Sequence, residues 1–369
     1  MSYLNINNKR LSFEELKKLP LGAESDFETK TLKYCKNWLL GKKEFEISTS
    51  GSTGTPKIIK LQRAQMEASA HMTIQTFGLD ANDHLLVNLH PSFIAGLMML
   101  VRGLESRAEI TVIEPTANPL ENFSPEASFS FLALVPMQLQ NIISNPQTKT
   151  IFEKAKAAII GGAAVGSSLM KEIKNLKPAL YSTYGMTETV THIAIKRING
   201  TQPDQYFQAL PGIQLSQDKE SCLCIKGKVT SGETIVTNDV VELFEGTKFN
   251  WTGRRDNIIN SGGIKIQLEK VEAEAESILA KLGYEGKPVA LAMPDEKLGE
   301  KLVLAIEQKK EALDLEQFKT QLKEALPSYH SPKEYFFVDQ IPLTPTQKVD
   351  RIGLRKTLRK NRQQLNRFG

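Results

Sequence analysis

Apolar and polar residues along the first 163 positions follow the pattern of an α/β domain. Residues 63–79 carry apolar side chains at helical spacing, which predicts a helix. Short apolar runs typical of buried strands follow it. Helices that alternate with such strands predict a sheet with helices on its faces. The expected strands cover residues 84–89, 109–115, 129–136 and 155–163.

The pattern changes beyond residue 208. Short alternating segments there predict an antiparallel β portion, and beyond residue 256 a small α+β unit follows. We therefore predict a large N-terminal domain over residues 1–255 and a small C-terminal domain over residues 256–369. The expected β portion covers 222–227, 233–244 and 248–253, and the small unit has helices over 268–282 and 315–326 and strands over 288–294, 301–307 and 334–338.

A run of small residues follows a predicted strand at 45–49. It reads STSGSTGTPKIIKL, at 48–61. Closely spaced backbone N–H groups with few side chains form a concavity that suits polyphosphate oxygens, and Lys57 adds a positive charge. The run differs from a Walker A loop, because Pro56 precedes the lysine and isoleucines follow it. A flexible Ser/Thr/Gly linker is the alternative interpretation.

Three further stretches carry candidate chemistry. In YSTYGMTET, at 181–189, a tyrosine can stack on a purine and Glu188 can bind magnesium, although a capped turn explains the same residues. Gly161 and Gly162 follow a predicted strand, where they permit close approach of a ligand or form an ordinary turn. Asp239, in TNDVVEL, can accept hydrogen bonds from ribose hydroxyls or is a surface aspartate.

Two more stretches concern the small domain. TGRRDNIINSGGIKI, at 252–266, has the residues of a hinge at the predicted domain boundary. PLTPTQKVDR, at 342–351, presents Lys348 on a turn. A lysine in such a place is ordinarily solvated, unless the domain folds back onto a nucleotide.

Composition limits the function classes. The 369 residues carry 47 Lys and Arg against 42 Asp and Glu, a net charge of +5. The excess lies in residues 351–369, where nucleic acid or an anionic membrane could bind, but interleaved aromatic residues are lacking and a solvated helix is favoured. The longest apolar run, 93–101, is too short to span a bilayer. With three cysteines and no apolar signal core, we expect a cytoplasmic protein with no nucleic-acid partner and no membrane insertion.

In their order along the chain, TSGSTGTPK, YGMTET, TNDVVEL, GRRDNIINSGG and PTQKVDR resemble the signature motifs of the acyl- and aryl-CoA synthetase superfamily of adenylate-forming enzymes. The resemblance implies the fold of that superfamily, with a large N-terminal domain and a small mobile C-terminal one. It also implies two reactions: a carboxylic acid and ATP form an acyl-adenylate, and the acyl group then passes to the thiol of coenzyme A. ATP, Mg²⁺ and coenzyme A are the expected cofactors and co-substrates.

The resemblance also assigns roles to single residues. The catalytic residues would be Lys348, which bridges the carboxylate and the α-phosphate, Thr187 at the α-phosphate and Glu188 at the metal. Asp256 resembles the hinge residue of the superfamily. The cofactor-binding residues would be Thr49, Ser50, Gly51, Ser52, Thr53, Gly54 and Lys57 for the β- and γ-phosphates, Gly161, Gly162, Ala163 and Tyr184 for adenine, Asp239 and Arg254 for ribose, and Gly262 and Gly263 for pantetheine. Gly185, next to Tyr184, is also expected to bind the cofactor.

Within the superfamily, FIAGLMMLVRGL, YGMTETVTHIAIKRING and YFQALPGIQL are similar to short bacterial o-succinylbenzoate-CoA ligases of menaquinone biosynthesis. Phe93, Gly96 and His192 are candidate contacts of the acid, with His192 about one helical turn beyond Glu188. The alternatives are transfer of another aryl or acyl group, transfer to a carrier-protein thiol, and a degenerate nucleotide-binding protein. A homo-oligomer is left open.

Three features depart from the superfamily's pattern. The phosphate loop begins already at Ser48, so we expect a large domain that is shortened at its N terminus. Leu97 stands at a position where a cation could have paired with a second carboxylate of the acid. This second carboxylate therefore has no assigned partner. Gln347 replaces the glycine that usually precedes the catalytic lysine.

Overall fold

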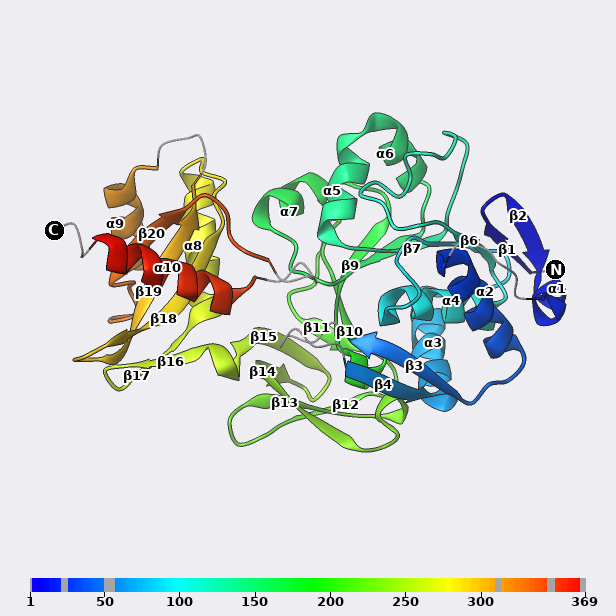
Figure 1. Cartoon of the computed structure of the whole chain (residues 1–369), viewed down its shortest axis with the longest axis horizontal. Helices are drawn as coiled ribbons and strands as arrows, with labels where there is room; N and C mark the ends of the chain where they lie inside the picture. The colour runs from blue at the N-terminus through cyan, green and yellow to red at the C-terminus, as the bar shows by residue number, and fades with distance from the viewer. Residues whose placement is uncertain (1, 21–25, 50–56, 309–312, 344–348, 366–369) are drawn as a thin grey trace. The chain divides into compact units, whose positions relative to one another are not determined.

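The computed structural model describes residues 2–20, 26–49, 57–308, 313–343 and 349–365 (Figure 1). Its internal contacts divide the chain into two compact units. The predicted boundary between residues 255 and 256, and the mobility of the small domain, stay predictions. Unit 1 comprises Met1–Ser216, Cys224–Val236 and Leu243–Asn250, and unit 2 comprises Gln217–Leu223, Thr237–Glu242 and Trp251–Gly369.

Most residues of a large sheet lie in unit 1, and residues 217, 222–223, 237–242 and 251–254 of its strands belong to unit 2. Strands β1, β6, β5, β7, β8 and β9 are neighbours in this order and run parallel, and β10 and β11 continue the sheet antiparallel. Beyond β11 follow β15, β14, β13 and β12, and β2 pairs with β1 at the other edge. The predicted α/β sheet with an antiparallel portion is confirmed. The strands are β1 (Tyr3–Ile6), β2 (Lys9–Ser12), β5 (His84–Val87), β6 (Glu109–Val112), β7 (Phe131–Leu134), β8 (Ala157–Ile160), β9 (Ala179–Gly185), β10 (His192–Arg197), β11 (Phe207–Ala209), β12 (Gln214–Gln217), β13 (Cys222–Lys226), β14 (Thr234–Phe244) and β15 (Lys248–Arg254).

Helices cover both faces of the parallel strands. Helices α5, α6 and α7 lie on one face, and α2, α3 and α4 lie on the other (Figure 1). Strands β7 and β8 are therefore buried at all four positions, which explains why their sequences are continuous apolar runs. The helices are α1 (Phe13–Lys18), α2 (Asp26–Leu39), α3 (Arg63–Phe77), α4 (Ile94–Ser106), α5 (Pro136–Ser144), α6 (Pro146–Phe152) and α7 (Ser167–Ile173).

A separate two-stranded sheet carries the ends of the predicted phosphate loop. Strand β3 (Glu44–Thr49) pairs antiparallel with β4 (Lys57–Gln62), and Thr49 is opposite Lys57. Antiparallel pairing brings the two ends of residues 50–56 together. Helix α3 follows β4 directly and begins at Arg63, where the sequence predicts a helix.

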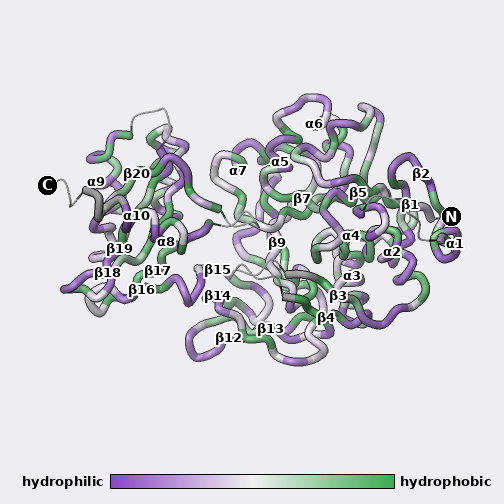
Figure 2. Tube along the Cα trace, in the orientation of Figure 1, coloured by the Kyte–Doolittle hydropathy of each residue, from purple (hydrophilic) through white to green (hydrophobic). Residues whose placement is uncertain are grey.

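Unit 2 contains a sheet in the order β17, β16, β19 and β18, with β20 pairing with β19. Alternate residues of β18 and β19 serve two cores: Ala290 and Leu304 pack with α8 and α9, whereas Leu291 and Val303 pack with α10. Hydrophobic and hydrophilic segments alternate along the coloured parts of the trace (Figure 2). The elements are β16 (Ile258–Ser261), β17 (Ile264–Gln267), α8 (Leu268–Lys281), β18 (Pro288–Asp295), β19 (Gly299–Glu307), α9 (Leu315–Ala325), β20 (Glu334–Val338) and α10 (Arg351–Leu365).

The basic C-terminal segment forms helix α10, but it is not solvated on all sides. Leu354 and Leu358 are each 1% exposed and belong to the second core of unit 2. The basic residues Arg355, Lys356 and Arg359 come between these leucines and around them, so the helix is amphipathic. Within the described residues, no helix has both the length and the apolar character needed to cross a membrane.

A buried asparagine fixes the start of strand β9. The side chain of Asn199 is 2% exposed, and its Oδ1 accepts a hydrogen bond from the Leu180 N–H at 2.9 Å. Its Nδ2 donates to the carbonyls of Leu176 and Pro178 at 3.0 and 2.8 Å. One amide therefore satisfies three main-chain groups beside the strand that leads to Tyr184.

We expect Asn199→Ala to lower the free energy of unfolding by about 2–4 kcal/mol, because main-chain groups would remain buried without a partner. Urea denaturation followed by circular dichroism measures this change. The control is Asn82→Ala, at an exposed asparagine whose side chain makes no hydrogen bond within the described residues, and we expect a change below about 0.5 kcal/mol. Equal effects of the two substitutions would contradict the anchoring role.

Candidate nucleotide and acid site

Two predicted glycine motifs meet at one edge of the sheet in unit 1. Strands β8 and β9 are parallel with Ile160 opposite Ser182, so Gly161 after β8 lies beside Thr183 in β9, and Gly162 follows it. A Cβ on Gly161 would lie 2.8 Å from Thr183 Oγ1, and Gly162 has a φ of +83°. The backbone here is bare and closely packed, at the carboxyl ends of parallel strands where α/β proteins bind ligands.

Tyr184 has aromatic neighbours that hold its ring. Its centroid lies 5.0 Å from the ring of Phe249 and 6.0 Å from that of Phe207. The Tyr184 side chain is half-buried, and an aromatic ring of this kind can stack on a flat ligand. Gly185 follows, and a Cβ there would lie 2.2 Å from the Thr191 carbonyl oxygen. No side chain fits at this position without a shift of the backbone.

The segment after Gly185 is short and strained. Thr187–Thr189 forms one turn of 3₁₀ helix, in which Glu188 is exposed and Thr189 is buried. Val190 has φ 65° and ψ −68°, and the Thr191 N–H donates to the Thr189 carbonyl at 2.8 Å. This is a γ-turn with positive φ, which is costly for a β-branched residue. Such strain is typical of functional sites.

His192 does not lie one helical turn beyond Glu188. The 3₁₀ turn ends at Thr189, and His192 opens strand β10, directly opposite Gly185 in β9. His192 is 5% exposed, so it is packed inside the free protein. Its role as a contact of the acid stays a prediction.

The neighbour of His192 is a buried arginine, which the sequence patterns did not indicate. Arg102 of α4 is 1% exposed, and its Nη2 lies 3.5 Å from His192 Nδ1. Nη2 also donates to Thr191 Oγ1 at 3.0 Å, and Nε donates to Thr73 Oγ1 at 3.1 Å. Within the described residues no acidic side chain pairs with Arg102, and burial lowers its pKa to about 9. The only available signal was a single charge inside the apolar run IAGLMMLVRGL.

The two other predicted acid contacts lie at the start of α4. Phe93 precedes the helix and is 51% exposed. Gly96 is buried, and a Cβ there would lie 2.2 Å from the Leu89 carbonyl oxygen. The absence of a side chain at Gly96 is therefore already explained by close packing of α4 against residues 89 and 90.

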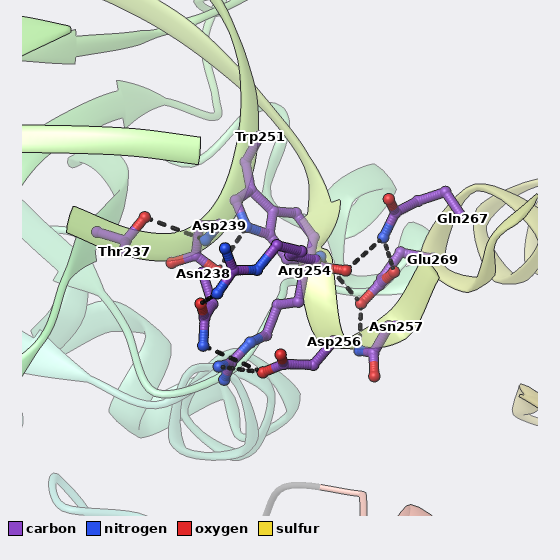
Figure 3. A network of polar contacts seen from close by, with 10 residues as sticks. Thr237, Asn238, Asp239, Trp251, Arg254, Asp256, Asn257, Gln267 and Glu269 are labelled. Atoms are coloured by element: carbon purple, nitrogen blue, oxygen red, sulfur yellow. Dashed lines mark hydrogen bonds and ion pairs between the residues drawn. The ribbon is translucent and has the colours of Figure 1, made fainter. Parts of the chain in front are cut away.

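The predicted ribose and hinge residues share one polar network in unit 2 (Figure 3). Trp251 Nε1 donates to Asp239 Oδ1 at 3.2 Å. Asp256 Oδ2 accepts hydrogen bonds from Asn238 Nδ2 and Arg254 Nη2, each at 3.2 Å. Because the Arg254 and Asp256 side chains are 47% and 57% exposed, water screens this ion pair and it contributes little to stability.

The same network reaches the start of α8. Gln267 Nε2 donates to the Arg254 carbonyl at 3.0 Å, and the Arg254 N–H donates to Glu269 Oε1 at 3.3 Å. Gly262 and Gly263 form the turn between β16 and β17, with φ of +62° and +87°. Two successive positive φ values favour glycine at this hairpin, whatever else the pair does.

A family model for AMP-binding enzymes matches residues 46–234, slightly more than half of the chain. The chain belongs to the AMP-binding enzyme family. It is 26% identical over 332 residues to the 2-succinylbenzoate–CoA ligase of Lactococcus lactis subsp. lactis (strain IL1403), and the match covers 85% of this chain and 70% of the relative. It is 27% identical over 298 residues to that of Escherichia coli (strain K12), covering 77% of this chain and 62% of the relative.

Among solved structures, this AMP-binding enzyme is similar to the acyl-CoA synthetase (AMP-forming)/AMP-acid ligase II-like protein from Dyadobacter fermentans DSM 18053. The identity is 39%, the TM-score is 0.65, and the match covers 94% of this chain and 99% of that one. The chain thus also belongs to the AMP-forming acid–CoA ligases of the family. The expected superfamily and fold are confirmed.

Several predicted residues of the AMP-binding enzyme lie outside the described parts of the structure. Ser50, Gly51, Ser52, Thr53, Gly54 and Lys348 are among them, and only the backbones of Thr49 and Lys57 are described. Thr187 is half-buried and Glu188 is exposed, so both side chains can meet a ligand. A carboxylate such as Glu188 suits Mg²⁺, which binds through few protein ligands, and no cluster of three or more metal-ligating side chains occurs in the described ranges. These residue roles stay predictions.

The buried histidine of this AMP-binding enzyme predicts a pH-dependent stability. Burial and the Arg102 charge lower the pKa of His192 well below 6.5. As the pH falls below about 6.5, the unfolded chain binds a proton at His192 that the folded chain refuses, so the free energy of unfolding falls by up to about 1.4 kcal/mol per pH unit. His192→Gln removes this contribution. Urea denaturation between pH 7 and 5 should therefore show a steeper decline for the wild type, and parallel curves would contradict the prediction.

Proposed function

We propose that this chain is an ATP-dependent acid–thiol ligase that converts 2-succinylbenzoate into its coenzyme A thioester. The family and the curated relatives support the reaction class and the acid. The observation that carries the choice of a dicarboxylic acid is the buried charge of Arg102, which has no acidic partner in the described residues.

Burying a guanidinium costs free energy unless an anion accompanies it. The arginine lies near the adenylation motif, because His192 contacts it and is opposite Gly185 in the sheet. A dicarboxylic acid can place one carboxylate at the nucleotide and the other at Arg102. The sequence alone assigned no partner to the second carboxylate. In this proposal its partner is Arg102.

Two steps follow from this arrangement. An oxygen of the acid's carboxylate attacks the α-phosphorus of ATP, the bond to pyrophosphate breaks, and an acyl-adenylate forms. The thiolate of coenzyme A then attacks the acyl carbon, and AMP leaves with the electron pair of the carbon–oxygen bond. Backbone N–H groups, Thr187 and Lys348 would offset negative charge in the first step. Mg²⁺ at Glu188 would neutralise phosphate charge when bound.

The other proposed contacts follow from the resemblance to the superfamily. Adenine would lie between Tyr184 and the backbone of Gly161, Gly162 and Ala163, where both glycines leave room. Asp239 and Arg254 would bind ribose, for which the Arg254–Asp256 pair must open. Gly262 and Gly263 would line the path of pantetheine after rotation about Asp256.

Pyrophosphate release by the wild type tests the reaction. With ATP and Mg²⁺ we expect release with 2-succinylbenzoate, and a thioester only when coenzyme A is also present. Lys348→Ala should lose most of the release because charge compensation at the α-phosphate is removed. Lys356→Ala, at an exposed lysine of α10, is the matched control and should keep it. Release with another acid, or transfer only to a carrier-protein thiol, would replace the proposed substrate, and silence across a panel of acids would favour a degenerate nucleotide-binding protein.

Arg102 predicts selectivity for the second carboxylate. Arg102→Met should raise KM for 2-succinylbenzoate about 10- to 100-fold, the range expected for loss of a charge-assisted hydrogen bond. Arg102→Lys keeps the charge and should lose less. Both variants are compared with an analogue of the acid that has hydrogen in place of the second carboxylate. Equal losses with both acids would show that Arg102 supports the fold and does not read the second carboxylate.

A further inference from the structure

The buried arginine is held from three directions by uncharged groups. Thr73 comes from α3, Thr191 from the turn after Val190, and His192 from β10. The hydrogen bonds occupy Nε and Nη2 of Arg102, whereas Nη1 donates no hydrogen bond within the described residues. We propose that Thr73, Thr191 and His192 are positioning residues that orient the guanidinium and leave Nη1 for the second carboxylate of the acid. This inference rests on the proposed function.

Donor and acceptor roles fix the state of His192. A guanidinium only donates, so Nδ1 of His192 must accept from Arg102 Nη2 at 3.5 Å. The proton of the neutral imidazole is then on Nε2, which lies 3.4 Å from Thr73 Oγ1 and donates to it. Arg102 is the charged group that faces the ring. A protonated ring could not accept from it and would place two positive charges together.

The same donor and acceptor roles give the Thr73 hydroxyl a full set of hydrogen bonds. Its Oγ1 accepts from Arg102 Nε and from His192 Nε2, and its own proton goes to the Ser69 carbonyl at 3.2 Å. Thr191 Oγ1 accepts from Arg102 Nη2 and lies 2.8 Å from Ser69 Oγ. The hydroxyl of each threonine thus helps to hold the guanidinium, and a buried network of this kind specifies one geometry.

Thr73, Thr191 and His192 together form a cage around Arg102. This cage orients the guanidinium without neutralising its charge. A protein carboxylate inside the cage would already pair with the guanidinium and would neutralise the charge that is proposed to bind the acid. Uncharged acceptors hold two edges of the guanidinium and leave its charge available to an incoming anion. Orientation before binding improves affinity because less freedom is lost when the acid arrives.

Kinetics with matched variants tests the positioning role. Thr191→Val keeps the shape and removes the acceptor of Nη2, whereas Thr191→Ser keeps the hydroxyl. We expect Thr191→Val to lower the ratio of kcat/KM for 2-succinylbenzoate to that for the analogue without the second carboxylate about tenfold, mainly through KM, and Thr191→Ser to restore it. An unchanged ratio in folded Thr191→Val would overturn the proposal.

A second measurement does not depend on the substrate. ¹⁵N NMR of the histidine side chains, with His192 assigned by comparison with His192→Gln, reports the protonation of each ring nitrogen. We expect a neutral ring with the proton on Nε2 from pH 8 to pH 5.5. Protonation of His192 near pH 6, or a proton on Nδ1, would overturn the cage. If the wild type does not use 2-succinylbenzoate, the proposed function fails, and the NMR result alone decides whether the cage exists.

Discussion

The close approach of Gly185 to residues 191 and 192 is the constraint on which the candidate site depends. A Cβ on Gly185 would lie 2.2 Å from the Thr191 carbonyl oxygen and 2.5 Å from the His192 Cα. Two chemically different regions are therefore joined without intervening side chains. On one side are Tyr184 and the glycines after β8, and on the other is the polar cage around Arg102. A shift of either strand would move both.

Much of the fold could be predicted because its signals are local. Strands such as β7 and β8, buried on both faces, stand out as continuous apolar runs. The glycine and hydroxyl motifs were recognisable for the same reason, since their residue types are needed within a few positions of one another. The order of these motifs along the chain then led to the family, which the matched model confirmed.

The proposed acid side of the site could not be predicted in the same way. Arg102, Thr73 and Thr191 come from three elements that are distant in the sequence, and each one is ordinary in its own segment. His192 was placed on a helical spacing, because the γ-turn at Val190 leaves no sequence signature: valine is among the last residues expected at positive φ. Asn199 was missed likewise, since its three main-chain partners become neighbours only after folding.

The γ-turn also limits which lengths the segment can have. It reverses the chain within three residues, and β10 already contains a register irregularity between His192 and Ala194. An inserted residue between 186 and 191 would have to be absorbed by a wider turn or by a slip of β10 against β9. A slip of one residue turns every side chain of a strand to the opposite face. Surface loops of this chain can accept insertions, but this segment cannot. Its length determines the geometry of the site.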